Sequence, residues 1–301
     1  MLRLARADEK NKIQDIWYQD LIRDTGFNNY FFALAYPKGK HYVLSNDEIE
    51  TVASVFKHGC CLHGRNLSTS IISDVRTLDK HKNKGNEIIL LKEVINQLSR
   101  QDLLTLVHAR NKELYQQLGF EVLYYRNCYK FERYVFEGVN TQGVTHEFKS
   151  EDLALVYRRF MQKFNGYVVR DKAYYDDYIL ELEFRKMHLM AVYQNDEIKA
   201  YFSFKIEGDS LYINECIYSD VKTLAKIISY CLKLAQYVYI YVSEAERLER
   251  IFKNTSFKTS EYMMARVNDY DLFNELYDCE VDNLKDAFKL LNRPLYIHED
   301  L

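Results

Sequence analysis

Two apolar runs, separated by a basic turn and a helical pattern, most constrain what this chain can fold into. The first run covers residues 71–78 and the second covers residues 103–109. The second run is almost wholly apolar, which is typical of a central strand that is covered on both faces of a sheet. Apolar residues recur at helical spacing from Glu87 to Leu98. The stretch therefore predicts strand, turn, helix and strand in an α/β sheet.

The turn before the predicted helix has the composition of an anion-binding site. Residues 81–86 read His-Lys-Asn-Lys-Gly-Asn and lead directly into the helix. The start of a helix offers free backbone N–H groups and the positive end of the helix dipole. Gly85 permits a close approach of the backbone, while Lys82 and Lys84 add positive charge. A lysine-rich solvated loop has the same composition, so the turn alone leaves both interpretations open.

A tyrosine follows the second predicted strand at a position where α/β sheets bind ligands. Tyr115 lies on a predicted helical turn within residues 114–120. This position places its phenol near the C-terminal ends of two neighbouring strands. A phenol with a pKa of about 10 can protonate a departing thiolate. A core tyrosine with a satisfied hydroxyl is the alternative.

Length and charge limit the possible classes of protein. The chain has 301 residues, enough for two domains, and 41 basic against 44 acidic residues give a net charge of −3. This balance argues against nucleic acid or an anionic membrane as the main partner. No apolar run approaches the roughly 20 residues of a membrane span, and the first ten residues become charged too early for a secretory signal. We expect a cytoplasmic protein.

The six cysteines predict neither a zinc site nor a disulfide framework. They are scattered along the chain without a CxxC pair. In a chain of this size, reduced and mostly buried thiols are the expected state. The sequence therefore predicts no bound metal.

The pattern of elements repeats along the chain. Residues 1–136 form the first predicted domain, and residues 137–147 are the stretch least suited to regular structure. From residue 145 to 268 the order of helices, meander strands, helix and central strand begins again, and residues 269–301 form a tail. The second strand-to-helix turn, residues 218–223, contains neither glycine nor a basic cluster. An internal duplication in which one site has been lost explains this order.

Four segments carry a resemblance to a known family. They are residues 77–85 and 118–121 in the first half, and residues 157–160 and 164–171 in the second. Together they resemble the GNAT N-acetyltransferases, and more closely their Eis-like branch (enhanced intracellular survival). The resemblance implies an α/β fold of α+β layers. It consists of two tandem GNAT-like domains, each a central mixed β-sheet flanked by helices, and a short C-terminal tail.

The resemblance also implies roles for individual residues, with acetyl-CoA as cosubstrate. Tyr115 would be the general acid. Backbone groups of Val75 and Thr77 would hold the pantetheine arm, and the pyrophosphate would be held by Lys82, Asn83, Lys84, Gly85 and Asn86. Lys82 replaces the usual arginine, which loses a bidentate phosphate contact. Glu87 occupies a position where many GNAT proteins have a small residue. We therefore expect acetyl-CoA to bind weakly or not at all.

Two carboxylates are candidates for the catalytic base. Eis-like proteins typically add a third domain whose final carboxylate enters the active site. Residues 283–291 and 294–301 resemble the end of that domain. We expect that most of the domain is lost and that the Leu301 carboxylate still reaches Tyr115. A frayed tail is the alternative. Asp74, on the strand that would face the acetyl group, is the alternative base or an anchor for the amine.

The expected reaction is direct acetyl transfer to an amine. A backbone N–H near Val75 would polarise the acetyl carbonyl. We assign the acceptor pocket to acidic and aromatic residues, namely Asp24, Phe27, Tyr30, Phe31, Tyr36 and Asp74. The acceptor would be a small-molecule or peptide amine, with no nucleic acid or membrane partner and with a possible homo-oligomer. A catalytically inactive GNAT-like binding or interaction module is the alternative function.

Overall fold

The structure is a computed structural model, and it describes residues 1–19, 25–132, 136, 138–253 and 255–299. The strands of the first half are β1 (Leu2–Leu4), β2 (Lys40–Ser45), β3 (Ile49–Leu62), β4 (Arg65–Thr77), β5 (Leu104–Val107) and β6 (Glu121–Glu132). Those that follow are β7 (Val144–Thr145), β8 (Tyr167–Val168), β9 (His188–Gln194), β10 (Glu197–Glu207), β11 (Ser210–Tyr218), β12 (Tyr237–Ser243) and β13 (Ser256–Val267). The α-helices are α1 (Lys10–Tyr18), α2 (Thr25–Tyr30), α3 (Asn86–Leu98), α4 (Lys112–Gln116), α5 (Ser150–Met161), α6 (Lys172–Phe184), α7 (Val221–Leu234), α8 (Tyr270–Tyr277) and α9 (Leu284–Ala287).

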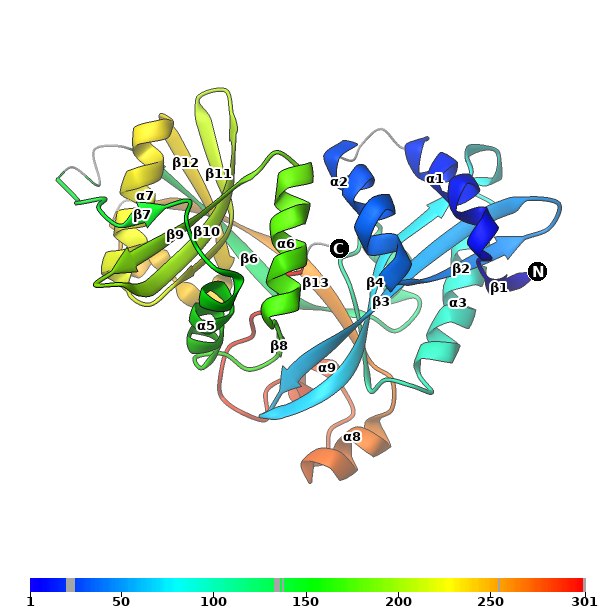
Figure 1. Cartoon of the computed structure of the whole chain (residues 1–301). Coiled ribbons are helices and arrows are strands. Elements are labelled where there is room, and N and C mark those ends of the chain that lie inside the picture. Colours follow the sequence, from blue (N-terminus) through cyan, green and yellow to red (C-terminus); the bar gives the residue numbers. More distant parts are fainter. Residues whose placement is uncertain (20–24, 133–135, 137, 254, 300–301) are drawn as a thin grey trace.

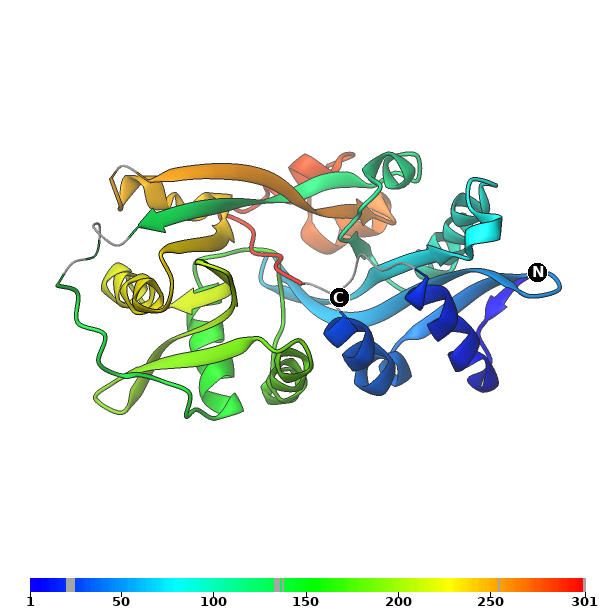
Figure 2. The same ribbon diagram turned by 90° about the horizontal axis from the view of Figure 1, so that it is seen from above.

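One mixed sheet runs through both halves of the chain (Figure 1). Its strand order is β1-β2-β3-β4-β5-β13-β6-β12-β11-β10-β9-β7, with β8 paired to β3. Helices α1 and α2 cover one face of the first half of the sheet and α3 covers the other (Figure 2). In the second half, α5 and α6 lie on one face and α7 on the other. The predicted α/β fold class is confirmed.

The two halves exchange strands. β13 comes from the second half, but it pairs antiparallel with both β5 and β6 of the first half. β6, in turn, pairs with β12 of the second half. Met264 of β13 is therefore buried in the core of the first half, while Tyr129 and Phe131 of β6 are buried in the core of the second. The sequence did not predict β13, and the predicted boundaries at residues 136 and 268 remain a prediction.

The predicted elements around the basic turn match the structure closely. The helix expected from Glu87 begins one residue earlier and ends at Leu98. Its buried face consists of Leu90, Leu91, Val94, Ile95 and Leu98. The strand-like pieces predicted before the turn merge into the long hairpin of β3 and β4. The weak stretch 137–147 holds the two-residue strand β7 at the sheet edge.

An internal repeat is visible in the strand register. In the first half, Val55 lies opposite Ile72 and Ser54 lies opposite Asp74, so Ser73 forms a β-bulge. In the second half, Phe204 lies opposite Ile213 and Ser203 lies opposite Glu215, so Asn214 forms the corresponding bulge. In both halves the bulge comes directly after the last residue of a parallel strand pair. This shared register supports the inferred duplication.

Two further observations concern membranes and metals. Among the described residues, no helix has the length and apolar character needed to cross a bilayer. The same residues contain no group of three or more His, Cys, Asp or Glu side chains placed to hold a metal ion. All six cysteines are free thiols, and Cys60, Cys216 and Cys231 are buried.

Candidate active site

The first candidate site lies where two parallel strands separate. β4 and β5 pair from Thr69 and Leu104 to Ile72 and Val107, and beyond this point β5 ends. The bulge at Ser73 follows immediately on β4. A bulge interrupts the ladder and can turn a backbone N–H toward a ligand, which is why bulges often adjoin active sites. The bulge lies two residues before Val75, near which the sequence predicts a backbone N–H that polarises the carbonyl.

A cavity of about 290 Å³, here called the acetyl cavity, occupies this separation. β4 contributes consecutive residues from Ser73 to Thr77, and α3 contributes Glu87. The remaining lining residues are Ile16, Gln19, Asp79, Lys82, His108, Arg110, Asn111, Leu114 and Tyr115. The cavity thus brings together five site residues that were predicted from three separate segments. They are Asp74, Val75, Thr77, Lys82 and Tyr115.

The remaining cradle residues lie between this cavity and the start of α3. Asn83 and Gly85 both adopt left-handed backbone conformations, with φ of 62° and 78°. Gly85 is the N-cap of α3, and a Cβ added there would meet open space. Lys84 is exposed. A tight loop, free space and the N-terminus of a 13-residue helix together fit a pyrophosphate group.

Carboxylates reduce the positive charge of this cradle. The Glu87 carboxylate accepts a hydrogen bond of 3.0 Å from the Thr77 hydroxyl, so the Thr77 side chain is engaged. Lys82 pairs with Asp79 at 2.6 Å. The Asn86 amide donates to Glu50 at 2.7 Å. The cradle is therefore close to electrically balanced.

Tyr115 lies at the base of the acetyl cavity. α4 holds it there, and the helix starts where the Asn111 side chain accepts a hydrogen bond from the Leu114 N–H at 3.2 Å. The Tyr115 ring packs edge-on against Phe120 and is 5% exposed. Burial, with smaller contributions from the Asp74 and Glu87 carboxylates, raises the pKa of Tyr115 above its usual value. The phenol therefore stays protonated at neutral pH, as a proton donor must.

Asp74 is held by an arginine on its own strand. Arg76 donates from Nε and from Nη2 to the same carboxylate oxygen, at 2.9 and 2.8 Å. Burial, together with the nearby charge of Arg110, lowers the pKa of Arg76 to about 10, and the guanidinium remains charged at neutral pH. The Asp74 carboxylate is therefore engaged in a nearly buried ion pair.

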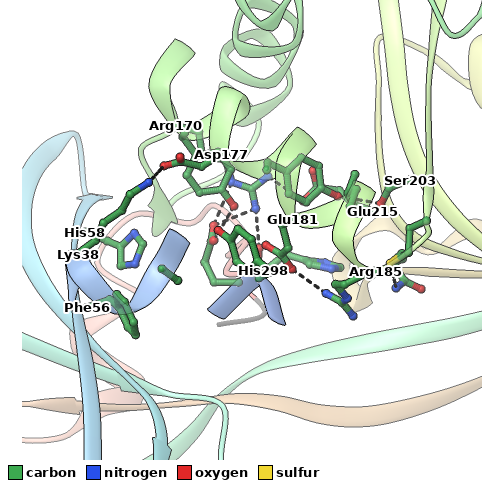
Figure 3. A pocket seen from close by; sticks show the side chains of 18 of the residues that line it. Lys38, Phe56, His58, Arg170, Asp177, Glu181, Arg185, Ser203, Glu215 and His298 are labelled. Carbon is green, nitrogen blue, oxygen red and sulfur yellow. Dashed lines mark hydrogen bonds and ion pairs between the residues drawn. The ribbon is translucent and has the colours of Figure 1, made fainter. Parts of the chain in front are cut away.

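A second cavity of about 240 Å³, here called the interdomain cavity, lies between the two halves (Figure 3). Its wall from the first half includes Phe56 and His58 of β3, with Lys38 and Tyr30. Its wall from the second half comes from α6, β10 and β11. Glu215 and the tail residues His298 and Glu299 also line the cavity. Among the described residues, none lines both cavities.

The predicted acceptor residues are distributed over several places. Tyr30 lines the interdomain cavity. Phe31 is 1% exposed and stacks on Trp17 with ring centroids 4.0 Å apart, so it lies in the hydrophobic core. Phe27 is also buried in that core. Tyr36 stacks on His41 at 3.7 Å. Asp74 lines the acetyl cavity instead, and Asp24 and Leu301 lie outside the described residues.

The charged residues that line the interdomain cavity form ion pairs. Lys38 pairs with Asp177 at 2.5 Å, and Arg185 pairs with Glu181 at 2.7 Å. Burial, with a smaller contribution from the charge of Arg170, lowers the pKa of His58 to about 4. His58 is therefore a neutral imidazole at neutral pH and can exchange a proton or a hydrogen bond with a bound amine.

Sequence reasoning missed His58, Arg170, Glu215 and Glu299, and it missed His108 in the acetyl cavity. Each lies on a strand, loop or tail whose local pattern gives no indication of the partner segment. The only available signal was indirect. Residues 164–171 were recognised as part of the resemblance, yet Arg170 was not assigned to a site.

Comparisons with known proteins agree on the fold. No family sequence model and no curated protein matches this sequence. A probable N-acyltransferase from Enterococcus faecalis has a TM-score of 0.75 at 17% identity, and the match covers 91% of this chain and 74% of that one. A GCN5-related N-acetyltransferase from Anabaena variabilis has a TM-score of 0.73 at 12% identity, covering 90% and 74%. Eis1 from Mycobacterium abscessus has a TM-score of 0.69 at 12% identity, covering 91% and 75%. The chain has the fold of the GNAT N-acetyltransferases, in the arrangement that Eis shares, as the sequence predicted.

Proposed function

We propose that the chain transfers an acetyl group from acetyl-CoA to an amine. The observation that carries this proposal is the placement of the Tyr115 phenol in the acetyl cavity, between the separated strands and the start of α3. GNAT acetyltransferase activity is also supported by the structural neighbours described above. A protonated tyrosine at this place suits the departure of a thiolate.

Different residues of the first half bind the cofactor and assist the transfer. The loop from Lys82 to Asn86 and the N-terminus of α3 bind the pyrophosphate through backbone N–H groups. Backbone groups of Val75 and Thr77 align the pantetheine arm, and the backbone beside the Ser73 bulge polarises the carbonyl. Acetyl-CoA supplies the activated acetyl group. The amine nitrogen bonds to the acetyl carbon, the carbon–sulfur bond breaks, and Tyr115 gives its proton to the sulfur.

A base must take a proton from the amine. The Leu301 carboxylate and Asp74 are the two candidates. The ion pair of Asp74 with Arg76 favours the Leu301 carboxylate. Extending the chain beyond Leu301 by two glycines tests this assignment, because it moves the carboxylate. Unchanged turnover of the extended protein would eliminate Leu301 as the base.

The interdomain cavity is the better candidate for the acceptor site. It is lined by Tyr30, by the neutral His58, and by the tail residues His298 and Glu299. The ion pairs around it present both signs of charge, which suits an amine that carries further polar groups. Of the predicted acceptor residues that the structure describes, Tyr30 is the one that lines this cavity.

An inactive GNAT-like binding module remains the second candidate function. The observation that favours it is the charge balance of the cradle, where Glu87 and Asp79 offset the lysines. A cradle without net positive charge holds a pyrophosphate less tightly. The two functions differ in turnover and in acetyl-CoA binding.

One experiment separates them. Acetyl-CoA is titrated into the protein by calorimetry, and free CoA thiol is then followed in the presence of a panel of amines. Binding together with amine-dependent thiol release supports the enzyme. Tyr115→Phe should keep acetyl-CoA binding but lose at least about tenfold in kcat, since general acids contribute roughly 10²–10⁴-fold. Failure to bind acetyl-CoA at high micromolar concentration would eliminate the proposed activity.

A further inference from the structure

The C-terminal tail is built into the interior of the molecule. Tyr296, Ile297, His298 and Glu299 are 0–6% exposed. The Asn165 N–H donates to the Pro294 carbonyl at 2.6 Å, and the Tyr296 N–H donates to the Gly166 carbonyl at 3.2 Å. The described part of the tail is thus fixed along the loop that follows α5.

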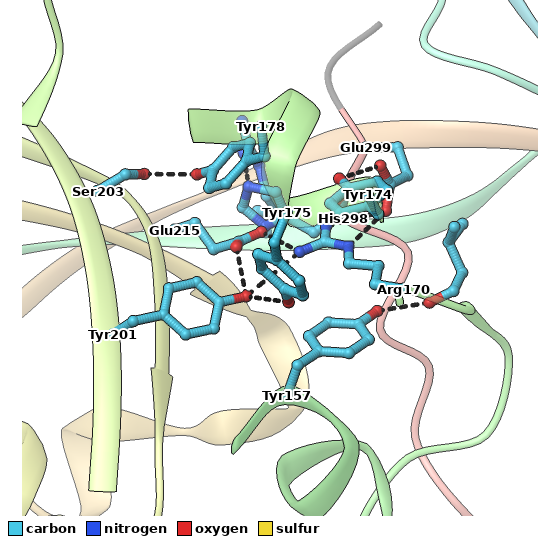
Figure 4. Close-up of polar contacts among 12 residues, drawn as sticks. Tyr157, Arg170, Tyr174, Tyr175, Tyr178, Tyr201, Ser203, Glu215, His298 and Glu299 are labelled. Carbon is cyan, nitrogen blue, oxygen red and sulfur yellow. Dashed lines mark hydrogen bonds and ion pairs between the residues drawn. The ribbon is translucent and has the colours of Figure 1, made fainter. Parts of the chain in front are cut away.

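Arg170 is the centre of the contacts that hold the end of this tail (Figure 4). Its Nε and Nη2 donate to one Glu299 carboxylate oxygen at 3.0 and 2.9 Å. Nη2 also donates to the His298 carbonyl at 2.6 Å. Nη1 donates to Glu215 on β11 at 2.7 Å. One guanidinium therefore ties two tail residues to the sheet of the second half.

Aromatic side chains complete this network. The Arg170 guanidinium lies 4.6 Å from the ring centre of Tyr157 and 4.7 Å from that of Tyr174. The Tyr174 hydroxyl donates to the second Glu299 oxygen at 2.8 Å. Although burial alone would lower the pKa of Arg170, the adjacent Glu215 and Glu299 carboxylates raise it well above its usual value. Arg170 is therefore a permanent cation with a fixed orientation.

A series of side-chain contacts runs from these tail residues to a residue of the acetyl cavity. His298 and Glu299 line the interdomain cavity. The Tyr262 hydroxyl on β13 donates to the Glu299 carbonyl at 3.0 Å. The Tyr262 ring lies 4.4 Å from the ring of His108, which lines the acetyl cavity. Glu299 is thus fixed from one side by Arg170 and from the other by the strand next to the acetyl cavity.

The cost of burying these charges suggests a role other than stability. A buried ion pair gains little net stability over well-packed apolar residues, because both charges lose their hydration. What an arginine ion pair does contribute is a fixed geometry, because a planar guanidinium donates its hydrogen bonds only in fixed directions. Here Arg170 fixes the described end of the tail, residues His298 and Glu299. These residues form part of the wall of the proposed acceptor site.

We infer that Arg170 is a positioning residue for acetyl transfer, acting through Glu299 on the acceptor side of the site. The inference rests on the proposed function. Arg170 does not touch the reacting atoms. It holds the tail residues that line the interdomain cavity, where the proposed acceptor amine binds.

Kinetics and hydrogen exchange on three variants test this inference. Glu299→Gln removes the charge that faces Arg170, and Arg170→Lys keeps a cation but loses the fork. Arg159→Lys is the matched control, because it makes the same change at an ion pair with Glu197, and neither residue lines either cavity. We measure KM for the best amine of the panel, kcat, the acetyl-CoA dissociation constant, and deuterium uptake of residues 294–299.

For Glu299→Gln and Arg170→Lys we expect KM for the amine to rise by about tenfold or more, kcat to fall, and the tail amides to exchange faster. The acetyl-CoA dissociation constant should stay within about twofold of the wild type, since the cradle is untouched. Arg159→Lys should match the wild type in all four quantities. Active variants with wild-type KM and a protected tail would overturn the inference while leaving the proposed function intact. An inactive wild type that does not bind acetyl-CoA overturns both.

Discussion

Under the proposed function, Glu87 is the residue expected to set the affinity for acetyl-CoA most directly. Its carboxylate lines the acetyl cavity and accepts the Thr77 hydrogen bond, so it lies beside the expected pyrophosphate. Glu87→Gln keeps an oxygen for this hydrogen bond and removes the negative charge. Repulsion between a carboxylate and a neighbouring phosphate in a partly hydrated site costs about 1 kcal/mol, or roughly fivefold in Kd.

We therefore predict that Glu87→Gln tightens acetyl-CoA binding about fivefold in low salt, as measured by calorimetry. The matched control is Glu93→Gln on the same helix, because Glu93 pairs with Gln97 outside the acetyl cavity. An affinity that is unchanged or weaker in Glu87→Gln would show that the carboxylate does not face the bound anion.

His58 predicts how stability changes with pH. The pKa of its imidazole falls from an ordinary value of 6.5 to about 4 in the folded chain, so the unfolded chain binds the proton more readily. The free energy of unfolding should therefore decrease as the pH falls from 6.5 to 4, by up to about 1.4 kcal/mol per pH unit from this residue. Above pH 6.5 the contribution of His58 is constant.

The measurement is urea denaturation of the wild type and His58→Gln between pH 4 and pH 8. The variant should lose stability less steeply below pH 6.5, because it has no imidazole to protonate. His146→Gln serves as the control, since His146 is exposed. Parallel pH profiles for the wild type and His58→Gln would contradict the assignment.

At the scale of single residues, the sequence located one cavity and missed the other for a physical reason. Tyr115, Val75 and Lys82 belong to adjoining elements whose order along the chain already brings them together at the end of a strand. The interdomain cavity joins His58, Arg170 and Glu299, which are separated by more than a hundred residues in sequence. Local periodicity carries no information about such a meeting.

At the scale of elements, local sequence pattern predicts α3 but not β13, whose position depends on distant segments. Helix α3 was predicted to within one residue because its apolar spacing is regular. β13 begins with six exposed residues and ends in buried ones, so it shows no sustained alternation. Its partners, β5 and β6, lie in the first half of the chain. Only the three-dimensional arrangement identifies it as a central strand.

The exchange of β13 predicts a long-range effect on stability. Met264 is 1% exposed and packs in the core of the first half, although its strand comes from the second half of the chain. Met264→Ala should lower the free energy of unfolding by about 2–5 kcal/mol, as for other buried methionines. Denaturant titration measures this loss. Lys258→Ala on the exposed end of the same strand should change it by less than about 0.5 kcal/mol. Equal losses would contradict the central place of β13.

At the scale of the whole molecule, the shared sheet predicts that both halves unfold together. β13 and β6 cannot leave their neighbours without opening both cores, and the tail is fixed to both halves through Tyr262 and Arg170. Cooperative loss of both cores is expected when contacts between them are this extensive. Trp17 provides a local probe, because it is the one tryptophan of the chain and is buried in the first half.

We predict that the unfolding midpoint measured by Trp17 fluorescence coincides with the midpoint measured by circular dichroism. The decisive variant is Phe202→Ala, which removes a fully buried ring from the core of the second half. It should shift the Trp17 transition to lower denaturant, because about 3–5 kcal/mol lost in one half is lost from the whole. Ile206→Ala, at a 40% exposed position of the same strand β10, should leave the transition in place. If the midpoint of Trp17 fluorescence were unchanged in Phe202→Ala, the first half would fold independently of the sheet it shares.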